Sequence, residues 1–242
     1  MSPQSGALAA AATDGQQLRP NTRIIAVVNQ KGGVGKSTTT LNQALMTVDA
    51  GGTAVGICGD PQNTLAQAAR LLERGRHGLP AGLEVYSEHD AVELRKLRRI
   101  RTVDRAYVDT PGSLENEGRV RAVLESSDLA VIPFNFDPYS LDPTLLTAKV
   151  CETLGVPYRV LMVQVPAGDR GVTLVEEARE TFDARHVPYF KAFTRSYVAY
   201  SDSIKNGVPL THWKGGNGTN ACGDQRRVHT AIELELSRLS AA

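Results

Sequence analysis

One run of ten residues, from Asn29 to Thr38, combines the residue types that bind a polyphosphate. Its three glycines let backbone N–H groups approach phosphate oxygens closely, and a helix starting here adds the positive end of its dipole. Lys36 supplies a full charge at the β- and γ-phosphates, and the Ser37 hydroxyl stands where such loops bind Mg²⁺. We predict a nucleotide-binding loop made by Lys31, Gly32, Gly33, Val34, Gly35, Lys36, Ser37 and Thr38.

This loop departs from the common phosphate-loop pattern. That pattern requires glycine five residues before Gly35, where this chain has Gln30, and it has no counterpart of Lys31. A glycine-rich turn without any ligand is the alternative. Two lysines, three glycines and a Ser-Thr pair in one register favour the phosphate loop.

Two carboxylates that follow apolar runs are candidates for work on the same ligand. Asp109 ends the run 106–109, and Mg²⁺, which prefers octahedral oxygen ligands and keeps several waters, suits an Asp at a strand end. Asp60 opens the segment Asp60-Pro61-Gln62-Asn63 after the run 54–58. Taken alone, Asp60 with Pro61 is also typical of a helix N-terminus.

The elements that must position these residues alternate along the chain. Buried strands are predicted at 24–28, 54–58, 83–86, 106–109, 129–134, 158–165 and 187–190, and helical spacing of apolar residues fills much of the sequence between them. We therefore predict an α/β fold, a doubly wound and mainly parallel sheet with helices on both faces. Ligands of such sheets bind at the carboxyl ends of the strands, where the loop and both carboxylates must converge.

The motifs resemble those of the ParA/MinD class of deviant Walker ATPases, and most closely those of its small partition proteins. Residues 31–37 match that class's KGGxGK[ST] loop at every fixed position, 60–63 resemble its DPQGN segment, 107–109 resemble its Walker B strand, and 110–113 resemble its switch turn. Two differences stand out, since Cys58 occupies a position that is often Asp and Asn63 one that is Gly. The class more often has Pro-Pro than Pro-Gly at 111–112.

The resemblance implies a mechanism and its residues. Lys36, Lys31 and Asp60 would be catalytic, with Lys31 reaching the partner's phosphates in an ATP-bridged homodimer and Asp60 orienting the attacking water. Ser37 and Asp109 would hold Mg²⁺, and Pro209 would lie on the base side of the ATP. Hydrolysis is expected to be slow and to be stimulated by a centromere-binding, ParB-like partner.

The resemblance also implies non-specific DNA binding through basic residues near the C-terminal end. The candidates are Arg195, Lys205, Lys214, Arg226 and Arg227. A denser basic run at 95–105 is interpreted as a solvated face, with contact to DNA or a partner as the alternative. The 27 Lys and Arg nearly balance the 26 Asp and Glu, so DNA binding requires a local patch rather than bulk charge.

The composition of the chain predicts its domain organisation and its cellular compartment. The 242 residues, 41% hydrophobic, suit one α/β domain at 23–242, and the Ala-, Gly- and Ser-rich residues 1–22 are expected to form a flexible tail. Three widely spaced cysteines and no long apolar run favour a cytoplasmic protein that contacts no membrane, and the resemblance implies that it is nucleoid-associated.

Three alternatives remain open from the sequence. The cargo could be plasmid or chromosomal DNA or a body that is not DNA. The altered segment around Asp60 could leave a nucleotide switch that does not hydrolyse ATP. The apolar residues of the final segment, Val228, Ile232, Leu236 and Leu239, could form a membrane-binding helix of the MinD kind, although docking on the core is the preferred interpretation.

Overall fold

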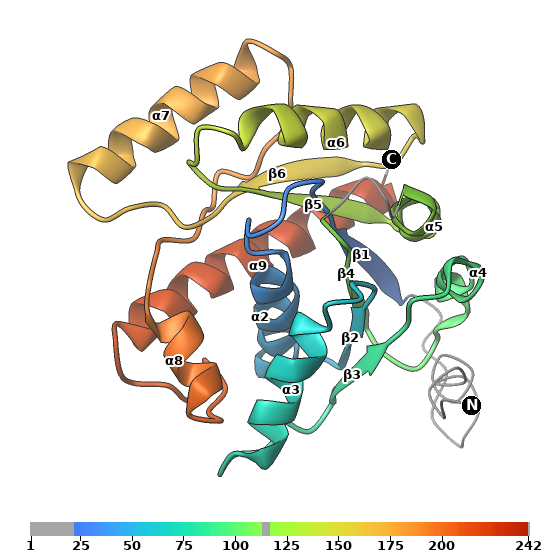
Figure 1. The fold of residues 1–242 in the computed structure, drawn as a ribbon, viewed down its shortest axis with the longest axis vertical. Coiled ribbons are helices and arrows are strands. Elements are labelled where there is room, and N and C mark those ends of the chain that lie inside the picture. The colour runs from blue at the N-terminus through green and yellow to red at the C-terminus, as the bar shows by residue number, and fades with distance from the viewer. Residues whose placement is uncertain (1–21, 113–116, 242) are drawn as a thin grey trace.

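A single parallel sheet organises the computed structural model, which describes residues 22–112 and 117–241 (Figure 1). The strand order is β3-β2-β4-β1-β5-β6, and every neighbouring pair is parallel. The strands are β1 (Arg23–Val27), β2 (Ala54–Cys58), β3 (Leu83–Ser87), β4 (Arg105–Asp109), β5 (Leu129–Phe134) and β6 (Tyr158–Met162). The predicted doubly wound α/β fold is confirmed.

Helices cover both faces of this sheet, as Figure 1 shows. They are α2 (Lys36–Asp49), α3 (Thr64–Arg74), α4 (Ala91–Leu94), α5 (Glu117–Glu125), α6 (Leu141–Thr153), α7 (Asp169–Asp183), α8 (Ala199–Lys205) and α9 (Gly218–Ala241), with a 3₁₀ turn at Leu97–Arg99. Helices α2, α3, α8 and α9 pack on one face, and α4 to α7 pack on the other.

The inner strands are mainly apolar because each is covered on both sides, whereas the edge strand β3 is only partly buried. Alternate residues of β1 enter different cores: Ile24 and Ala26 belong to the core under α4 to α7, and Ile25 belongs to the core under α2 and α9. All six residues of β5 are buried. Two-sided burial explains why these segments read as continuous apolar runs rather than as alternating ones.

One predicted strand does not join the sheet as a strand. The segment 187–190 runs beside β6 but makes only an isolated bridge, between Tyr189 and Val160. Pro188 offers its carbonyl to the Val160 N–H, at 2.9 Å, but has no N–H to give in return. The predicted strand 158–165 is likewise shorter and ends at Met162.

Helix α9 docks on the core. Its apolar stripe, Val228, Ile232 and Leu236, is buried against the α2 side of the sheet, as preferred in the sequence interpretation. Within residues 22–112 and 117–241, no helix combines the length and the hydropathy needed to cross a bilayer. The tail 1–21, and Ser113 at the end of the predicted switch turn, lie outside the described residues.

The sheet register brings the candidate residues to one edge. Asp109 at the end of β4 is in register with Val27 of β1 on one side and with Cys58 of β2 on the other. The phosphate loop follows β1, the Asp60 segment follows β2, and the turn 110–112 follows β4. All three motifs therefore start from neighbouring strand ends.

Candidate nucleotide-binding site

The loop between β1 and α2 uses glycine where the backbone requires it. Gly33 and Gly35 have φ angles of 75° and 81°, in the left-handed region that other residues rarely adopt. Gly35 also stands at the N-terminal end of α2, whose first residues carry no side-chain cap. The free N–H groups at this helix start face the loop, which is the geometry that binds anions.

Helix α6 anchors the beginning of the loop. The buried Asn29 amide donates to the Pro133 carbonyl at 2.8 Å and to the Thr144 hydroxyl at 3.0 Å, and its oxygen accepts from the Lys31 N–H at 2.9 Å. The Gln30 N–H donates to the Thr147 hydroxyl at 3.2 Å. Thr144 and Thr147 could not be identified from the sequence, because the spacing of residues in α6 does not distinguish them from ordinary core positions.

Lys36 is folded back over its own loop. Its Nζ donates to the Lys31 carbonyl at 2.8 Å, and only 7% of the residue is exposed. Burial lowers the pKa of the Lys36 ammonium, while the nearby Asp109 and Asp60 carboxylates raise it. A cation held in this way is ready to bind an anion that enters the loop.

Asp109 is the most unusual group of the site. It is fully buried, and its Oδ2 accepts a hydrogen bond from the Ser37 hydroxyl at 2.6 Å. Its Oδ1 is buried without a hydrogen-bond partner. Burial raises the pKa of the Asp109 carboxyl to about 7, although the Ser37 hydrogen bond and the Lys36 charge lower it. A buried, unpaired carboxylate oxygen next to a hydroxyl is a suitable environment for a hydrated divalent cation.

Residues of the phosphate loop, the Asp60 segment and the turn 110–112 line one cavity of about 690 Å³, and Asp109 is buried outside its lining. The lining residues come from all three motifs, namely Gly32, Gly33, Gly35, Lys36, Ser37, Thr38, Asp60, Pro61, Gln62, Thr64, Pro111, Gly112 and Gln164. Val34, by contrast, is fully buried below the loop and can contribute only its backbone to a ligand. The cavity is polar and open, as a site for a polyphosphate must be.

Asp60 faces this cavity from the turn before α3. Its Oδ1 accepts from the Gln62 N–H at 2.9 Å, which closes a local turn, and its carbonyl accepts from the Asn63 N–H. The residue that caps α3 is Asn63, in a left-handed conformation with φ 56°. Asp60 is therefore not the cap of that helix, which removes the simplest alternative to a role at the ligand.

The switch turn packs directly on the loop. A Cβ at Gly112 would lie 2.7 Å from the Lys36 Nζ and 3.1 Å from the Gly32 N. A larger residue at position 112 would thus have to displace the Lys36 ammonium and press on the Gly32 backbone, although the resemblance favours proline there.

The Lys31 side chain makes its contacts within its own subunit. Its Nζ forms an ion pair with Asp137 and donates to the Ser140 hydroxyl at 3.0 Å, both in the loop between β5 and α6. The Ser140 hydroxyl in turn donates to the Asn135 side chain. Asp137 and Ser140 were not identified from the sequence.

A second cavity, of about 440 Å³, adjoins the first and shares Gly35, Thr38, Thr64 and Gln164 with it. Tyr197, Tyr200 and Lys205 line its far side. Pro209, the predicted base-side residue, is buried in the turn after α8, where its carbonyl accepts from the His212 N–H at 2.8 Å. It lines neither cavity, so its contact with a nucleotide stays a prediction.

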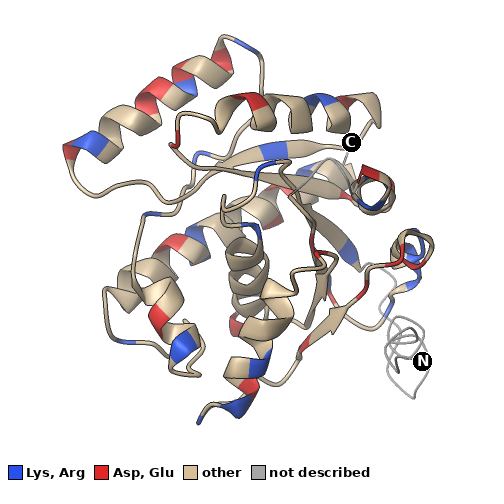
Figure 2. Ribbon diagram, viewed as in Figure 1, with Lys and Arg blue, Asp and Glu red and all other residues tan. Residues whose placement is uncertain are grey.

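The five basic residues predicted to bind DNA do not form one uniform patch. Arg195 and Arg227 both pair with the buried Asp224, and Arg226 pairs with Asp49 at the end of α2. Lys205 borders the second cavity, and Lys214 is an exposed residue in the turn before α9. Figure 2 shows basic residues interspersed with acidic ones on several helices, including α7.

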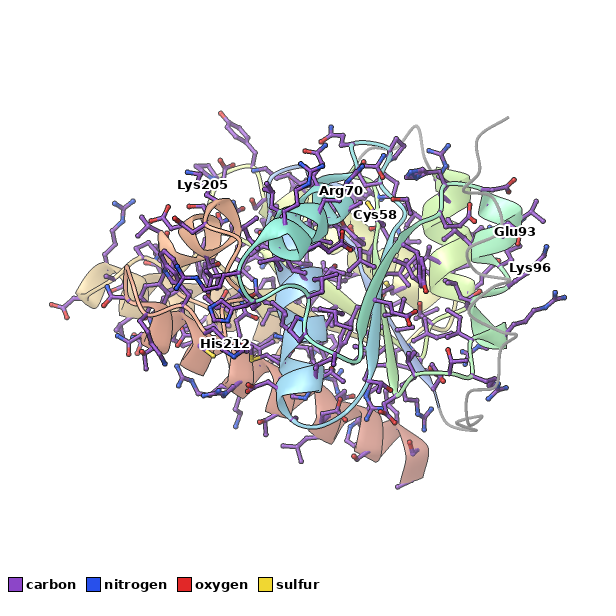
Figure 3. All side chains as sticks on the ribbon, turned by 90° about the horizontal axis from the view of Figure 1, so that it is seen from below. Cys58, Arg70, Glu93, Lys96, Lys205 and His212 are labelled. Carbon is purple, nitrogen blue, oxygen red and sulfur yellow. The ribbon has the colours of Figure 1, made fainter. Side chains whose placement is uncertain are left out.

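The basic run 95–105 lies elsewhere, and at least three of its six basic residues form ion pairs with acidic residues. Lys96 pairs with Glu93, Arg98 with Asp128, and Arg105 with Glu233. In Figure 3, Lys96 lies at the opposite end of the molecule from Lys205. Lys96 and Lys205 therefore do not lie in one local patch.

A glycine loop between the first strand and its helix, with a buried Asp at the end of a neighbouring strand, defines a P-loop nucleotide-binding fold. A family model described as an AAA domain matches residues 22–90. The maintenance of carboxysome distribution protein A from Gloeobacter kilaueensis is 33% identical over 216 residues, which cover 88% of this chain and 95% of that protein.

Solved structures agree with this assignment of the fold. The structure of apo McdA from Cyanothece superposes with a TM-score of 0.69 at 13% identity, covering 88% of this chain and 100% of that one. The cell division ATPase MinD of Pyrococcus furiosus gives a TM-score of 0.67 at 19% identity, with 87% and 98% covered. The chain belongs to the ParA/MinD family of deviant Walker ATPases.

Proposed function

We propose that this protein hydrolyses ATP with Mg²⁺ in the cavity formed by the phosphate loop, Asp60 and the turn 110–112. One observation carries the proposal, the environment of the Asp109 carboxylate. Its Oδ2 accepts a hydrogen bond from the Ser37 hydroxyl at 2.6 Å, and its Oδ1 is buried without a hydrogen-bond partner. The Ser37 hydroxyl would bind Mg²⁺ directly, and Asp109 would hold it through water. The cation supplies charge neutralisation for the phosphates.

The residues of this chain then have separate tasks. Lys36 would exchange its bond to the Lys31 carbonyl for the β- and γ-phosphates, which restores a full partner to a buried ammonium. The glycine N–H groups would hold the phosphate oxygens. Asp60 would orient the attacking water, because it faces the same cavity and its Oδ1 is held by the Gln62 N–H.

Lys31 would serve a second subunit. An ATP-bridged homodimer brings the loops of two chains face to face, and a second lysine charge is valuable at a γ-phosphate from which water is excluded. In the single chain Lys31 is paired with Asp137, so dimerisation must exchange that ion pair for the partner's phosphates.

The cycle would position a cargo on DNA. The ATP-bound dimer would bind DNA without sequence preference through Arg195, Arg227 and their neighbours, and a partner protein on the cargo would stimulate hydrolysis and release it. Partition of plasmid or chromosomal DNA fits this cycle. Positioning of a body that is not DNA fits it equally, and the name of the relative at 33% identity, which refers to carboxysome distribution, favours that cargo.

The test is phosphate release by the purified protein with ATP and Mg²⁺, alone, with duplex DNA, and with the product of a neighbouring gene. The Lys36→Ala variant controls for contaminating ATPases. Mg²⁺-dependent release that the control lacks supports the proposal. ATP binding and ATP-dependent dimerisation without any release would instead identify a nucleotide switch, for which the departures at Cys58 and Asn63 would be the sequence cause.

A further inference from the structure

Asp224, on α9, is a carboxylate that sequence analysis did not single out. Its side chain is completely buried. Its Oδ2 accepts from the Arg195 backbone N–H at 2.9 Å and from Arg195 Nε at 3.0 Å, and its Oδ1 accepts from Arg195 Nη2 at 2.7 Å. The Arg227 Nη2 donates to the same Oδ1. One buried carboxylate thus holds two guanidinium groups.

Both arginines keep a large exposed part. The side chains of Arg195 and Arg227 are 39% and 60% exposed, and Arg195 also lies over the ring of Tyr197, with its Cζ 5.4 Å from the ring centre. A guanidinium has five N–H donors, so each arginine retains donors that Asp224 does not use. The carboxylate and the aromatic ring restrict the rotamers that these long side chains could otherwise adopt.

The support beneath Asp224 is rigid. Its neighbour Gln225 accepts from the Gln43 side chain at 2.7 Å, and both glutamines are buried. Gln43 belongs to α2, the helix that begins at the phosphate loop. Asp224 is therefore fixed against the central element of the domain, and groups held by rigid elements are positioned more accurately than groups on loops.

The two arginines stand at a groove between α7 and the segment 191–195, a cavity of about 650 Å³. Its charged lining residues are Arg179, Lys191, Arg195 and Arg227, against Asp169 and Glu176. The Arg179 Nη2 donates to the Lys191 carbonyl at 3.1 Å, which ties α7 to the segment across the groove. The groove is thus a cationic surface with planar donors at one side.

We infer that Asp224 is a positioning residue that presents Arg195 and Arg227 as a fork for one phosphodiester group of a DNA backbone. This inference rests on the proposed function, which assigns DNA binding to these arginines. Paired planar guanidinium groups match the oxygens of a phosphate, and contacts of this kind hold a protein on a duplex without reading its sequence. Asp224 itself touches no phosphate.

A positioning role for Asp224 predicts a change in DNA affinity opposite in sign to the change expected from charge alone. Replacing a carboxylate by an amide removes a negative charge, which by itself strengthens binding to a polyanion. If Asp224 positions the arginines, the Asp224→Asn variant binds DNA more weakly although it is more positive. Two phosphate contacts per dimer correspond to about 60-fold in affinity at about 0.1 M salt by counterion release, so a weakening between about fivefold and about 60-fold is expected.

The experiment measures binding of a fluorescent mixed-sequence duplex by anisotropy, with saturating ATP and Mg²⁺, at several salt concentrations. The matched control is Glu233→Gln, which removes the same charge from another arginine-paired carboxylate of α9, the partner of Arg105, without touching the groove. The control should bind as the wild type does or slightly more tightly. Light scattering verifies that each variant still dimerises with ATP.

A second variant keeps the inference testable if replacement of the buried Asp224 prevents folding. Arg195→Lys keeps the charge at a partly exposed site but loses the fork, so it should weaken binding while the salt dependence stays close to that of the wild type. If Asp224→Asn and Arg195→Lys bind like the control, the positioning role is refuted while DNA binding stands. If the wild type does not bind the duplex even at low salt, the proposed DNA binding fails, and the inference fails with it.

Discussion

Replacing Asp109 by asparagine is expected to stabilise the nucleotide-free protein while destroying its response to Mg²⁺-ATP. Burial raises the pKa of this carboxyl from 3.8 to about 7, which corresponds to about 4 kcal/mol of unfavourable free energy once the group is ionised. An amide of the same shape can still accept from Ser37, but its unpaired N–H₂ group costs roughly 2 kcal/mol. The net gain in unfolding free energy is therefore about 2 kcal/mol at pH 8.

The sign depends on pH in a defined window. Because the pKa is higher in the folded protein than in the unfolded chain, the folded state binds more protons between pH 3.8 and about 7, and wild-type stability falls as pH rises through that interval. The advantage of Asp109→Asn should thus be near zero at pH 5 and full above pH 7. For a domain of this size, 2 kcal/mol raises the melting temperature by roughly 4–8 °C.

Thermal melts of both proteins at pH 5 and pH 8, with EDTA and without nucleotide, test this reasoning. A second set with Mg²⁺-ATP should stabilise the wild type and leave the variant without the Mg²⁺-dependent part of that gain. Either of two results would refute the argument that burial destabilises the ionised Asp109 carboxylate in the absence of a cation. The first is a variant less stable than the wild type at pH 8, and the second is a difference in melting temperature that does not change with pH.

Four further substitutions separate the tasks of the site. Lys36→Ala should lose ATP affinity outright, whereas Lys31→Ala should bind ATP but stay monomeric, because only Lys31 serves the second subunit; light scattering with Mg²⁺-ATP checks this, and a normal Lys31→Ala dimer would contradict it. Asp60→Ala should retain ATP and lose turnover, since a water-positioning carboxylate acts on the transition state, and turnover within a few-fold of the wild type would exclude the role. Gly112→Ala should weaken ATP binding a few-fold in a titration, because its Cβ would lie 3.1 Å from the Gly32 backbone N and would press on the phosphate loop, while Gly118→Ala, where nothing lies within 4 Å, is the matched control; equal affinities would show that the turn 110–112 moves freely.

Much of the fold was accessible from the sequence because its signals are local. A parallel sheet covered on both faces needs strands that are apolar throughout, so the runs 54–58 and 129–134 could be recognised with the bounds that the structure has. The exception, 187–190, shows the limit of that signal. Apolar character alone does not reveal that Pro188 prevents continuous pairing with β6.

The candidate site was accessible in part for the same reason. The glycines at 33 and 35 and the lysines at 31 and 36 lie in one short stretch of backbone, so their spacing alone predicts a phosphate-binding loop. The supporting groups are different. Asp137 lies 106 residues from Lys31 and Asp224 lies 29 residues from Arg195, and each is an ordinary acidic residue in the sequence until folding brings it to its partner.

By itself, the sequence determined the strand-loop-helix that binds phosphate, the order of the three motifs and the parallel sheet, because these depend on local backbone requirements and on burial on both faces of a strand. Only the tertiary structure decided how the charges are used. It buried Asp109 with one oxygen unpaired, turned Lys31 to Asp137, and paired Arg195 and Arg227 with Asp224 and Arg226 with Asp49. The physical reason is that burial and ion pairing depend on which distant segments meet, and the free energy of a charge depends on those surroundings far more than on its neighbours in the chain.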